Sequence, residues 1–527
     1  MSRNRYAITL AAFTTVMLAA GCTSHPVATP TPSPTAVKGQ ARTAMPAAAT
    51  SVVPGASAAE LAIATSHALF TSAPAVVLAA LDDAAAITKA ATTATGLGVP
   101  LLLSPASPKP SASASPAPSA SPSTSPSTAS VAADPVLQTE LTRLTPQAVV
   151  TVGDGAAAYE RATSTGRTVA VGLGPSDDSA LPNVSPAPPL NDLLVLALPG
   201  DASTAAIATA KAAGARVITL SSADPRASVK ALANQNAAHV LGLGTAFGSA
   251  DILRSRVDTA VTGVEIPGGG QIVFPGRRMV ALYGHPGNST LGVLGEQGVD
   301  AAIARAKAVA ATYNGLSSEP VVPAFDLIAT VASSGAGSDG NYSNESSVDF
   351  LKPWVDAAKA NGVYVMLDLQ PGRTDFLTQA KLYATLLQEP NVGLALDPEW
   401  RLKPDQVHLK QIGSVGVDEI NATGAWLDDL TRSHHLPQKV FMVHQFRTDM
   451  IQGRERLQAN YDTLRVVIHA DGFGTPGEKN STWSTLHINP PANVLWGWKN
   501  FYDEDKPTFT PAQTMAVQPA PVFVSYQ

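Results

Sequence analysis

Six apolar segments in the C-terminal half of the chain run into acidic or histidine residues at or near their ends. They are residues 279–285, 321–326, 363–368, 392–399, 439–445 and 464–471. In parallel α/β folds, the polar groups that carry chemistry collect where strands end, because those ends feed the loops of one open face. Repetition of the pattern at successive strands therefore predicts one shared pocket.

Stretches of helical character separate these segments. In residues 298–313, 348–361, 376–387 and 417–432, apolar residues recur at spacings of three and four. Two later apolar segments, 492–498 and 521–526, bring the number of β-segments to eight. A repeating β then α pattern over about 250 residues fits a (β/α)8 TIM barrel. We expect this barrel at residues 277–527.

Side-chain alternation predicts which residues point into the barrel. Val392, Leu394 and Leu396 suit a helix layer, whereas the small Gly393 and Ala395 suit a crowded interior and place Asp397 on the interior side. Pro398 favours an extended backbone before it, which keeps Glu399 on the same side. By the same two-residue logic, we expect the remaining inward acids at three further strand ends, namely Asp326, Asp368 and Asp471.

Convergent carboxyl groups are what the cleavage of a glycosidic bond requires. One carboxyl donates a proton to the leaving oxygen, and the other acts as nucleophile or as base for a water. The catalytic candidates are Asp397, Glu399, Asp368 and Asp471. Neighbouring strands about 4.8 Å apart would give Asp368 and Asp397 the spacing of a retaining pair, whereas Glu399 and Asp471, two strands apart, are nearer the inverting range. Both possibilities stay open.

Further side chains near the strand ends are candidates for substrate binding. Histidines orient a substrate or join carboxylates around a metal, and aromatic rings pack on the apolar face of a sugar. The candidates are Tyr283, His285, Asp326, His444, Gln445, His469, Trp496 and Trp498. No H-x-H or H-E-x-x-H motif is present, so we expect neither a metal nor another cofactor, and a metal-dependent hydrolase remains an alternative.

The preceding part of the chain, residues 57–275, alternates short β-branched runs with Ala-rich stretches. The order strand, helix, strand, helix, strand occurs twice, beginning near residues 73 and 192. Two βαβαβ repeats with continuous apolar strands predict a parallel, three-layer α/β sandwich. Residues 104–130 are rich in Ser, Pro and Ala and are expected to form a disordered insertion in this domain.

The first of these repeats resembles the bacterial cell-wall-binding repeat 2 family. The matching segments are Val76 to Ala80, Asp82-Asp83, Gly98 to Leu103 and Val149 to Gly153. The resemblance implies a parallel α/β fold and attachment to a wall polymer. The C-terminal half is similar to glycoside-hydrolase-type TIM barrels in general architecture, which implies action on a polysaccharide.

The N-terminus has the features of an export signal. Arg3 and Arg5 precede an apolar run from residue 6 to residue 20. The sequence Leu18-Ala19-Ala20-Gly21-Cys22 resembles the bacterial lipobox, which implies a signal peptide at residues 1–21 and a diacylglyceryl group on Cys22. The resemblance predicts a lipid-anchored protein on the extracytoplasmic face of the cell membrane. Residues 22–56, rich in Pro, Ser, Thr and Ala, are expected to be a disordered tether.

Net charge and glycine spacing argue against two classes of partner, nucleic acid and nucleotide. A formal net charge of −6 with 14% charged residues gives no surface for nucleic acid. The glycines at 153–155 and 242–244 do not complete a G-x-G-x-x-G motif, so nucleotide is not expected. The sequence predicts a surface-anchored glycosidase that acts on envelope or environmental polysaccharide. The alternatives are a non-catalytic surface protein that binds glycan or protein, and the metal-dependent hydrolase.

Overall fold

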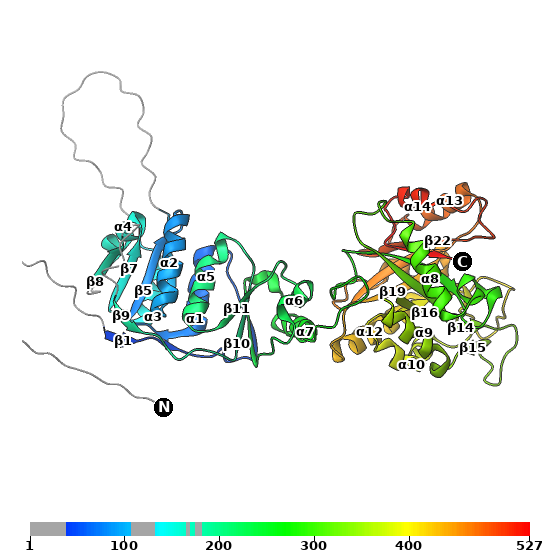
Figure 1. The fold of residues 1–527 in the computed structure, drawn as a ribbon, viewed down its shortest axis with the longest axis horizontal. Coiled ribbons are helices and arrows are strands. Elements are labelled where there is room, and N and C mark those ends of the chain that lie inside the picture. The colour runs from blue at the N-terminus through cyan, green and yellow to red at the C-terminus, as the bar shows by residue number, and fades with distance from the viewer. Residues whose placement is uncertain (1–37, 107–131, 165–168, 174–181) are drawn as a thin grey trace, which may run out of the picture. The chain divides into compact units, whose positions relative to one another are not determined.

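The computed structural model describes residues 38–106, 132–164, 169–173 and 182–527 (Figure 1). The expected signal peptide, Cys22, the first part of the tether and residues 107–130 of the expected insertion lie outside the described residues.

Two four-stranded sheets form the core of the N-terminal part, and all of their paired strands are parallel. The first has the order β6 (Leu101–Ser104), β5 (Ala75–Ala80), β7 (Ala148–Val152), β8 (Val169–Leu173). The second has the order β11 (Arg216–Thr219), β10 (Leu193–Ala197), β12 (His239–Leu243), β3 (Thr50–Val53). The predicted parallel α/β architecture is confirmed, and each repeat forms a sheet of its own.

Helices, several of them rich in alanine, connect and cover these strands. They are α1 (Ala58–Leu69), α2 (Ala84–Leu97), α3 (Pro135–Leu144), α4 (Asp154–Thr163), α5 (Asp201–Ala212), α6 (Val229–Leu232) and α7 (Ala250–Val261). Helices α1 and α2 both pack on α5 (Figure 1), since small alanine side chains let helix backbones approach closely. One apolar core includes Leu78 of the first sheet and Val195 of the second.

Two expected boundaries of this part were wrong. The tether was expected to reach residue 56, but residues 38–53 contain β1 (Lys38–Gln40), β2 (Arg42–Thr43) and the sheet strand β3. The β-branched run Thr50–Val53 pairs with β12 and supplies the fourth strand of the second sheet. The expected insertion began at Ser104, which is buried as the last residue of β6.

Asp83, which belongs to the segment resembling the wall-binding repeat, has a local structural role. Its side chain is the N-cap of α2 and accepts a hydrogen bond of 2.9 Å from the backbone N–H of Ala86. Gly98 ends the same helix at φ 67°, a left-handed conformation that glycine adopts without strain. The two residues therefore fix where α2 begins and ends.

Eight parallel strands form a closed barrel in the C-terminal part. They are β13 (Arg278–Gly284), β14 (Val321–Ala332), β16 (Tyr364–Leu369), β17 (Val392–Leu396), β19 (Lys439–Gln445), β21 (Leu464–Ala470), β22 (Leu495–Asn500) and β23 (Phe523–Tyr526). Each pairs with the next in chain order, and β23 pairs with β13, which closes the ring. The expected TIM-like barrel is confirmed.

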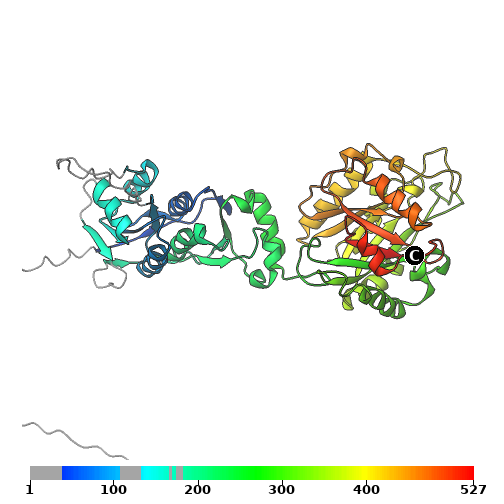
Figure 2. The ribbon, with the colours of Figure 1, turned by 90° about the horizontal axis from the view of Figure 1, so that it is seen from above.

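Helices lie outside the barrel strands (Figures 1 and 2). They are α8 (Val299–Ala311), α9 (Val348–Ala360), α10 (Phe376–Leu382), α11 (Ala384–Leu387), α12 (Val417–Ser433), α13 (Pro476–Leu486) and α14 (Pro511–Ala516). The connection from β19 to β21 departs from the expected pattern, because it contains the short strand β20 (Ile451–Gln452) between two 3-10 turns and no α-helix.

The segment before β13 closes the N-terminal end of the barrel. Ile266, Val273 and Phe274 pack in the barrel interior, and the backbone N–H of Gln438 donates to Gln271 O at 2.8 Å. The barrel unit therefore begins about ten residues before the expected boundary at residue 277.

The barrel strands alternate as expected. Val392, Leu394 and Leu396 pack in the outer apolar layer, whereas Ala395 packs in the interior. A Cβ at Gly393 would lie 2.6 Å from Val440 O, so only glycine fits there. Asp397 continues this inward series and points into the barrel interior at its C-terminal end.

A search of the described helices for one that is long and apolar enough to cross a membrane finds none.

Candidate functional site

A layer of polar side chains fills the C-terminal end of the barrel. Its members come from successive strands and from the residues that follow them, and almost all are buried. They are Tyr283, Asp326, Asp368, Gln370, Asp397, Glu399, His444, His469, Asp471 and Lys499. The sequence-predicted acids of all four strand ends are therefore brought together at one end of the barrel.

His444 lies at the centre of this cluster. Its Nε2 is 3.6 Å from Asp368 Oδ1 and 3.8 Å from Asp326 Oδ2, and its Nδ1 is 3.3 Å from Asp471 Oδ2. Burial lowers the pKa of His444, but the surrounding carboxylates outweigh burial and raise this pKa to about 10. The imidazole is therefore a cation at neutral pH, and it compensates the negative charge of three strand ends.

Burial has the opposite effect on the deep carboxyl groups. It raises the pKa of Asp326 to about 7, although the charge of His444 opposes this rise. The pKa of Asp368 is raised by burial as well, again against His444. For Asp397, burial acts together with the charges of Glu399 and Asp368, and the pKa rises well above its ordinary value. Part of the cluster is therefore protonated near neutral pH, which limits repulsion among five carboxyl groups.

Hydrogen bonds and a ring contact organise the side of the cluster around Tyr283. The Tyr283 hydroxyl donates to Asp368 Oδ2 at 3.1 Å and accepts from Gln370 Nε2 at 3.2 Å. Burial raises the pKa of Tyr283 well above its ordinary value, so the phenol stays a neutral donor. Lys499 Nζ stands 3.4 Å from the centroid of the Tyr283 ring, a cation–π arrangement.

His469 supports the cluster from below. Burial lowers its pKa well below the ordinary value, and the charges of His444 and Lys499 lower it further. Its ring lies 5.0 Å from that of His444, and its Nε2 is 3.2 Å from Ser525 Oγ. A Cβ at Gly497 would lie 2.4 Å from His469. His469 is thus a neutral, packed residue beneath the charged layer.

A cavity of about 690 Å³ opens above the cluster. Of the five clustered carboxyl groups, only those of Glu399 and Asp471 line it, while Asp326, Asp368 and Asp397 lie beneath. Burial raises the pKa of Glu399 to about 7, and the charge of Asp471 adds to this rise. The cavity therefore presents a carboxyl group that holds its proton near neutral pH beside a second carboxyl group.

The rest of the cavity wall is largely apolar and aromatic. Trp400, Phe446, Phe473 and Phe501 contribute rings, and Ile328 contributes an aliphatic surface. A second cavity of about 820 Å³ shares Glu399, Trp400 and Ile412 with the first. Glu399 therefore stands where two neighbouring cavities meet.

Four candidate residues lie elsewhere. His285 stacks on Phe350 and bonds to Ser346 Oγ at 3.0 Å, so it packs against the start of α9 and does not line the cavity. Gln445 follows the outward alternation of β19 and accepts from Arg454 at 3.3 Å. Trp496 and Trp498 pack in the outer apolar layer. These four residues therefore do not line the barrel cavity.

The sugar site expected from the sequence predicts a contrast between a tryptophan of the cavity and one of the outer layer. Trp498 is 2% exposed and packs against Trp483 and Phe509, so Trp498→Ala is expected to cost about 3–5 kcal/mol of stability without changing glycan affinity. Trp400→Ala is expected to weaken glycan binding about five- to tenfold with little loss of stability. Guanidinium denaturation and calorimetric titration with an oligosaccharide measure the two effects, and the reverse pattern would contradict the assignment.

Sequence reasoning missed two polar residues of the site, Lys499 and Gln370. The expected strand ended at residue 498, two positions before the end of β22 at Asn500, although the alternation that sets Gly497 inward also sets Lys499 inward. Gln370 continues the inward series of Met366 and Asp368 in the same way. The two-residue alternation was present in both strands, but the expected strands ended before Gln370 and Lys499.

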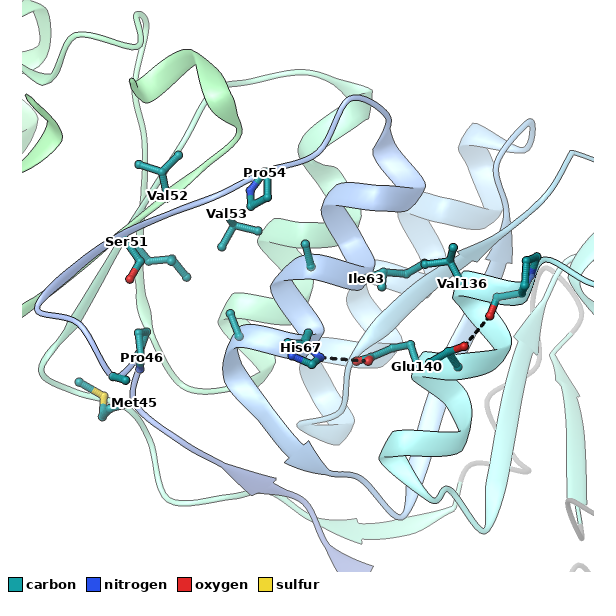
Figure 3. A pocket seen from close by; sticks show the side chains of 16 residues that line it. Met45, Pro46, Ser51, Val52, Val53, Pro54, Ile63, His67, Val136 and Glu140 are labelled. Atoms are coloured by element: carbon teal, nitrogen blue, oxygen red, sulfur yellow. Dashed lines mark hydrogen bonds and ion pairs between the residues drawn. The ribbon is translucent and has the colours of Figure 1, made fainter. Parts of the chain in front are cut away.

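The N-terminal part has a cavity of its own, of about 880 Å³, formed by α1, α3 and β3 (Figure 3). Its walls are mostly apolar, with Met45, Val53 and Ile63 among them. His67 Nδ1 lies 3.7 Å from Glu140 Oε2 in this cavity, and Arg143 pairs with Glu140 at 2.6 Å. Because this carboxylate is already neutralised, the barrel cavity is the better candidate for chemistry.

The described residues hold no group of three or more His, Cys, Asp or Glu side chains placed to bind a metal ion. In the same part of the chain, both oxygens of Asp326 and both ring nitrogens of His444 form no hydrogen bond. Their compensation is therefore electrostatic, through the ion pairs with each other and with their neighbours.

No family model and no curated protein match the chain. Five solved chains match it, and one of them is Cwp6 from Clostridium difficile, at 11% sequence identity and a TM-score of 0.29. The match covers 78% of this chain and 63% of the Cwp6 chain.

Proposed function

We propose that the protein is a glycosidase-like hydrolase of polysaccharide. The observation that carries the proposal is the pair Glu399 and Asp471, which face one cavity while a raised pKa of about 7 lets Glu399 keep a proton. Paired carboxyl groups of unlike protonation are the requirement for cleaving a glycosidic bond. The aromatic wall of the cavity suits sugar rings, whose faces are apolar.

The environment of each acid suggests its role. Glu399 donates its proton to the leaving glycosidic oxygen as the bond from the anomeric carbon breaks. Asp471, held 3.3 Å from the cationic His444, acts as nucleophile or as base for a water. Asp368 and Asp397, expected as catalytic residues, lie under these groups. We assign them an electrostatic role, in which they contribute to the charge of the cluster. Asp326 belongs with them.

A polymer fits the cavity better than a single sugar. The two cavities that meet at Glu399 have volumes of about 690 and 820 Å³, and each alone is in the range that holds a drug-sized ligand. Large apolar side chains are exposed at the rim, namely Leu409 (83%), Ile412 (41%) and Phe473 (63%). A polysaccharide lying across Glu399 would cover these side chains on both sides of the glycosidic bond to be broken.

The direct test is the release of new reducing ends from a panel of envelope and environmental polysaccharides by the full chain. Release that disappears in Asp471→Asn supports the proposal. Tight glycan binding without release, unaffected by either Asp471→Asn or Glu399→Gln, would contradict it and identify a binding protein. Loss of activity in the presence of a chelator, with metal found by elemental analysis, would identify a metal-dependent hydrolase.

The pH dependence follows from Glu399. Its pKa is raised to about 7, so the acid form that donates the proton is lost as pH rises, and activity is expected to fall about tenfold per pH unit above pH 7. In Asp471→Asn the neighbouring negative charge is gone, and the pKa of Glu399 is expected to fall. Carbon NMR of labelled glutamate measures this shift without any activity. An unchanged pKa would show that the two groups do not interact.

We also propose that the protein acts at the cell surface. Its support is the resemblance of residues 18–22 to a lipobox and of the first repeat to wall-binding repeats. The protein is then held on the extracytoplasmic face of the membrane by a diacylglyceryl group on Cys22, close to wall polymer. Cys22→Ala is expected to move the protein from the membrane fraction to the soluble fraction, as seen by immunoblotting after fractionation. Equal membrane retention of the variant would refute the anchor.

A further inference from the structure

We propose that the ammonium group of Lys499 binds an anionic substituent of the substrate, a carboxylate or phosphate carried by a sugar unit. This inference rests on the proposed function and deepens it, because it names the class of polysaccharide: an acidic glycan.

Comparison with the other buried lysines of the barrel carries the argument. Lys479 is 2% exposed, and its Nζ donates to Gly472 O and Lys499 O and pairs with Asp505 at 2.9 Å. Lys439 is fully buried, and its Nζ donates to Glu389 O and Val392 O at 2.7 and 2.8 Å. Both ammonium groups are thus held by acceptors from their own chain, as buried charges require.

Lys499 differs from both. It is only 4% exposed, yet within the described part of the chain its Nζ forms no hydrogen bond and no ion pair within 4.0 Å. Its close contact is the face of the Tyr283 ring at 3.4 Å, which offers no lone pair. Lys499 also lines the cavity. The donors of this ammonium group are therefore available to a molecule in the cavity.

The neighbouring structure holds Lys499 in place before a substrate arrives. Lys479 Nζ donates to the backbone oxygen of Lys499 at 2.7 Å, and β22 pairs with β23 through Lys499 itself. The Tyr283 ring beneath it is fixed by Asp368 and Gln370. A cation that is already positioned loses little freedom on binding, which favours a contact with an anion.

The charge of the cluster also permits an anion. Burial raises the pKa of Asp326 and that of Glu399 to about 7, so both are partly protonated near neutral pH, while His444 is a cation. Because the charge of Lys499 acts on Asp326 and on Glu399, two groups that partly hold a proton, these carboxyl groups neutralise it only in part. A carboxylate or phosphate in the cavity would restore the balance through a charge-assisted hydrogen bond.

The test compares binding of an acidic polysaccharide with binding of the same polymer after its carboxyl groups are reduced to alcohols. Calorimetric titration of the full chain carrying Glu399→Gln measures both affinities without turnover. We expect the acidic polymer to bind about tenfold more tightly or better, and Lys499→Met to remove this preference while Lys499→Arg retains much of it. A phosphate-bearing polymer in a third titration distinguishes phosphate from carboxylate.

The matched control is Lys410→Met, which removes an exposed lysine of the neighbouring cavity. The preference should survive this change. Equal affinities of the parent protein for the acidic and neutral polymers would overturn the proposal, and this arm does not depend on any lysine variant being folded. Loss of preference in Lys410→Met as well would also overturn it, since general attraction would explain the result. Hydrolysis is not measured, so failure of the proposed reaction would leave this outcome unaffected.

Discussion

Replacement of Glu399 by Gln is expected to lower the rate of glycan hydrolysis by about 10² to 10⁴-fold. The amide has nearly the same shape as the protonated carboxyl group, so packing around Trp400 and Ile412 at the junction of the two cavities should be preserved. It holds no proton that can be transferred to the leaving oxygen. The measurement is the initial rate of reducing-end release at pH 6, where Glu399 carries its proton in the parent protein.

Glu504→Gln is the matched control for this change. Glu504 lines the same cavity but is exposed at its rim, so it is expected to retain activity within a factor of about two. A substrate with a good leaving group, such as a nitrophenyl glycoside, needs little proton donation and should restore part of the rate of Glu399→Gln. Full activity of Glu399→Gln on the natural polymer would rule out Glu399 as the acid.

Replacement of His444 by Leu is expected to lower the free energy of unfolding of the barrel at pH 8 by about 3–5 kcal/mol. The change leaves Asp326, Asp368 and Asp471 without the cation that lies 3.3 to 3.8 Å from their oxygens. All six tryptophans lie between residues 354 and 498, so tryptophan fluorescence during guanidinium denaturation reports on the barrel.

The free energy of unfolding of the barrel is expected to depend on pH through His444 and Asp326. In the parent protein the folded pKa of His444, about 10, lies above the unfolded value of 6.5, so its contribution is complete below pH 6.5 and is lost as pH rises through 10. Asp326 has a raised folded pKa of about 7, so the stability linked to its proton is present below pH 4 and is lost as pH rises through 7. The barrel is therefore expected to weaken steadily from pH 4 to pH 10.

The variant should recover part of its loss at pH 5, because its uncompensated carboxyl groups take up protons there. His285→Leu serves as the control, since this histidine lies outside the cluster, stacks on Phe350 and bonds to Ser346 Oγ and to the backbone of Gly287. A loss in His444→Leu that is the same at pH 5 and pH 8 would show that the cost is one of packing rather than of charge.

Side-chain alternation along each strand could be read directly from the sequence. Gly393, Ala395 and Asp397 face inward as predicted because the two-residue period of a strand is a local property of the backbone. The eight β-segments and the helices at 298–313, 348–361 and 417–432 follow from equally local periodicities. The closed barrel and the gathering of acids at one end were therefore within reach of sequence reasoning.

Depth within the barrel was decided only by the tertiary structure. Asp397 and Glu399 are two residues apart and share a direction, yet one is sealed under the cluster and the other lines the cavity. Trp498 and Lys499 are adjacent, and one packs in the outer layer while the other reaches the cavity. The difference depends on the register between strands, on the loops that cover their ends, and on the charge that His444 brings from a distant strand. These contacts join residues far apart in the chain, and a local pattern contains no information about them.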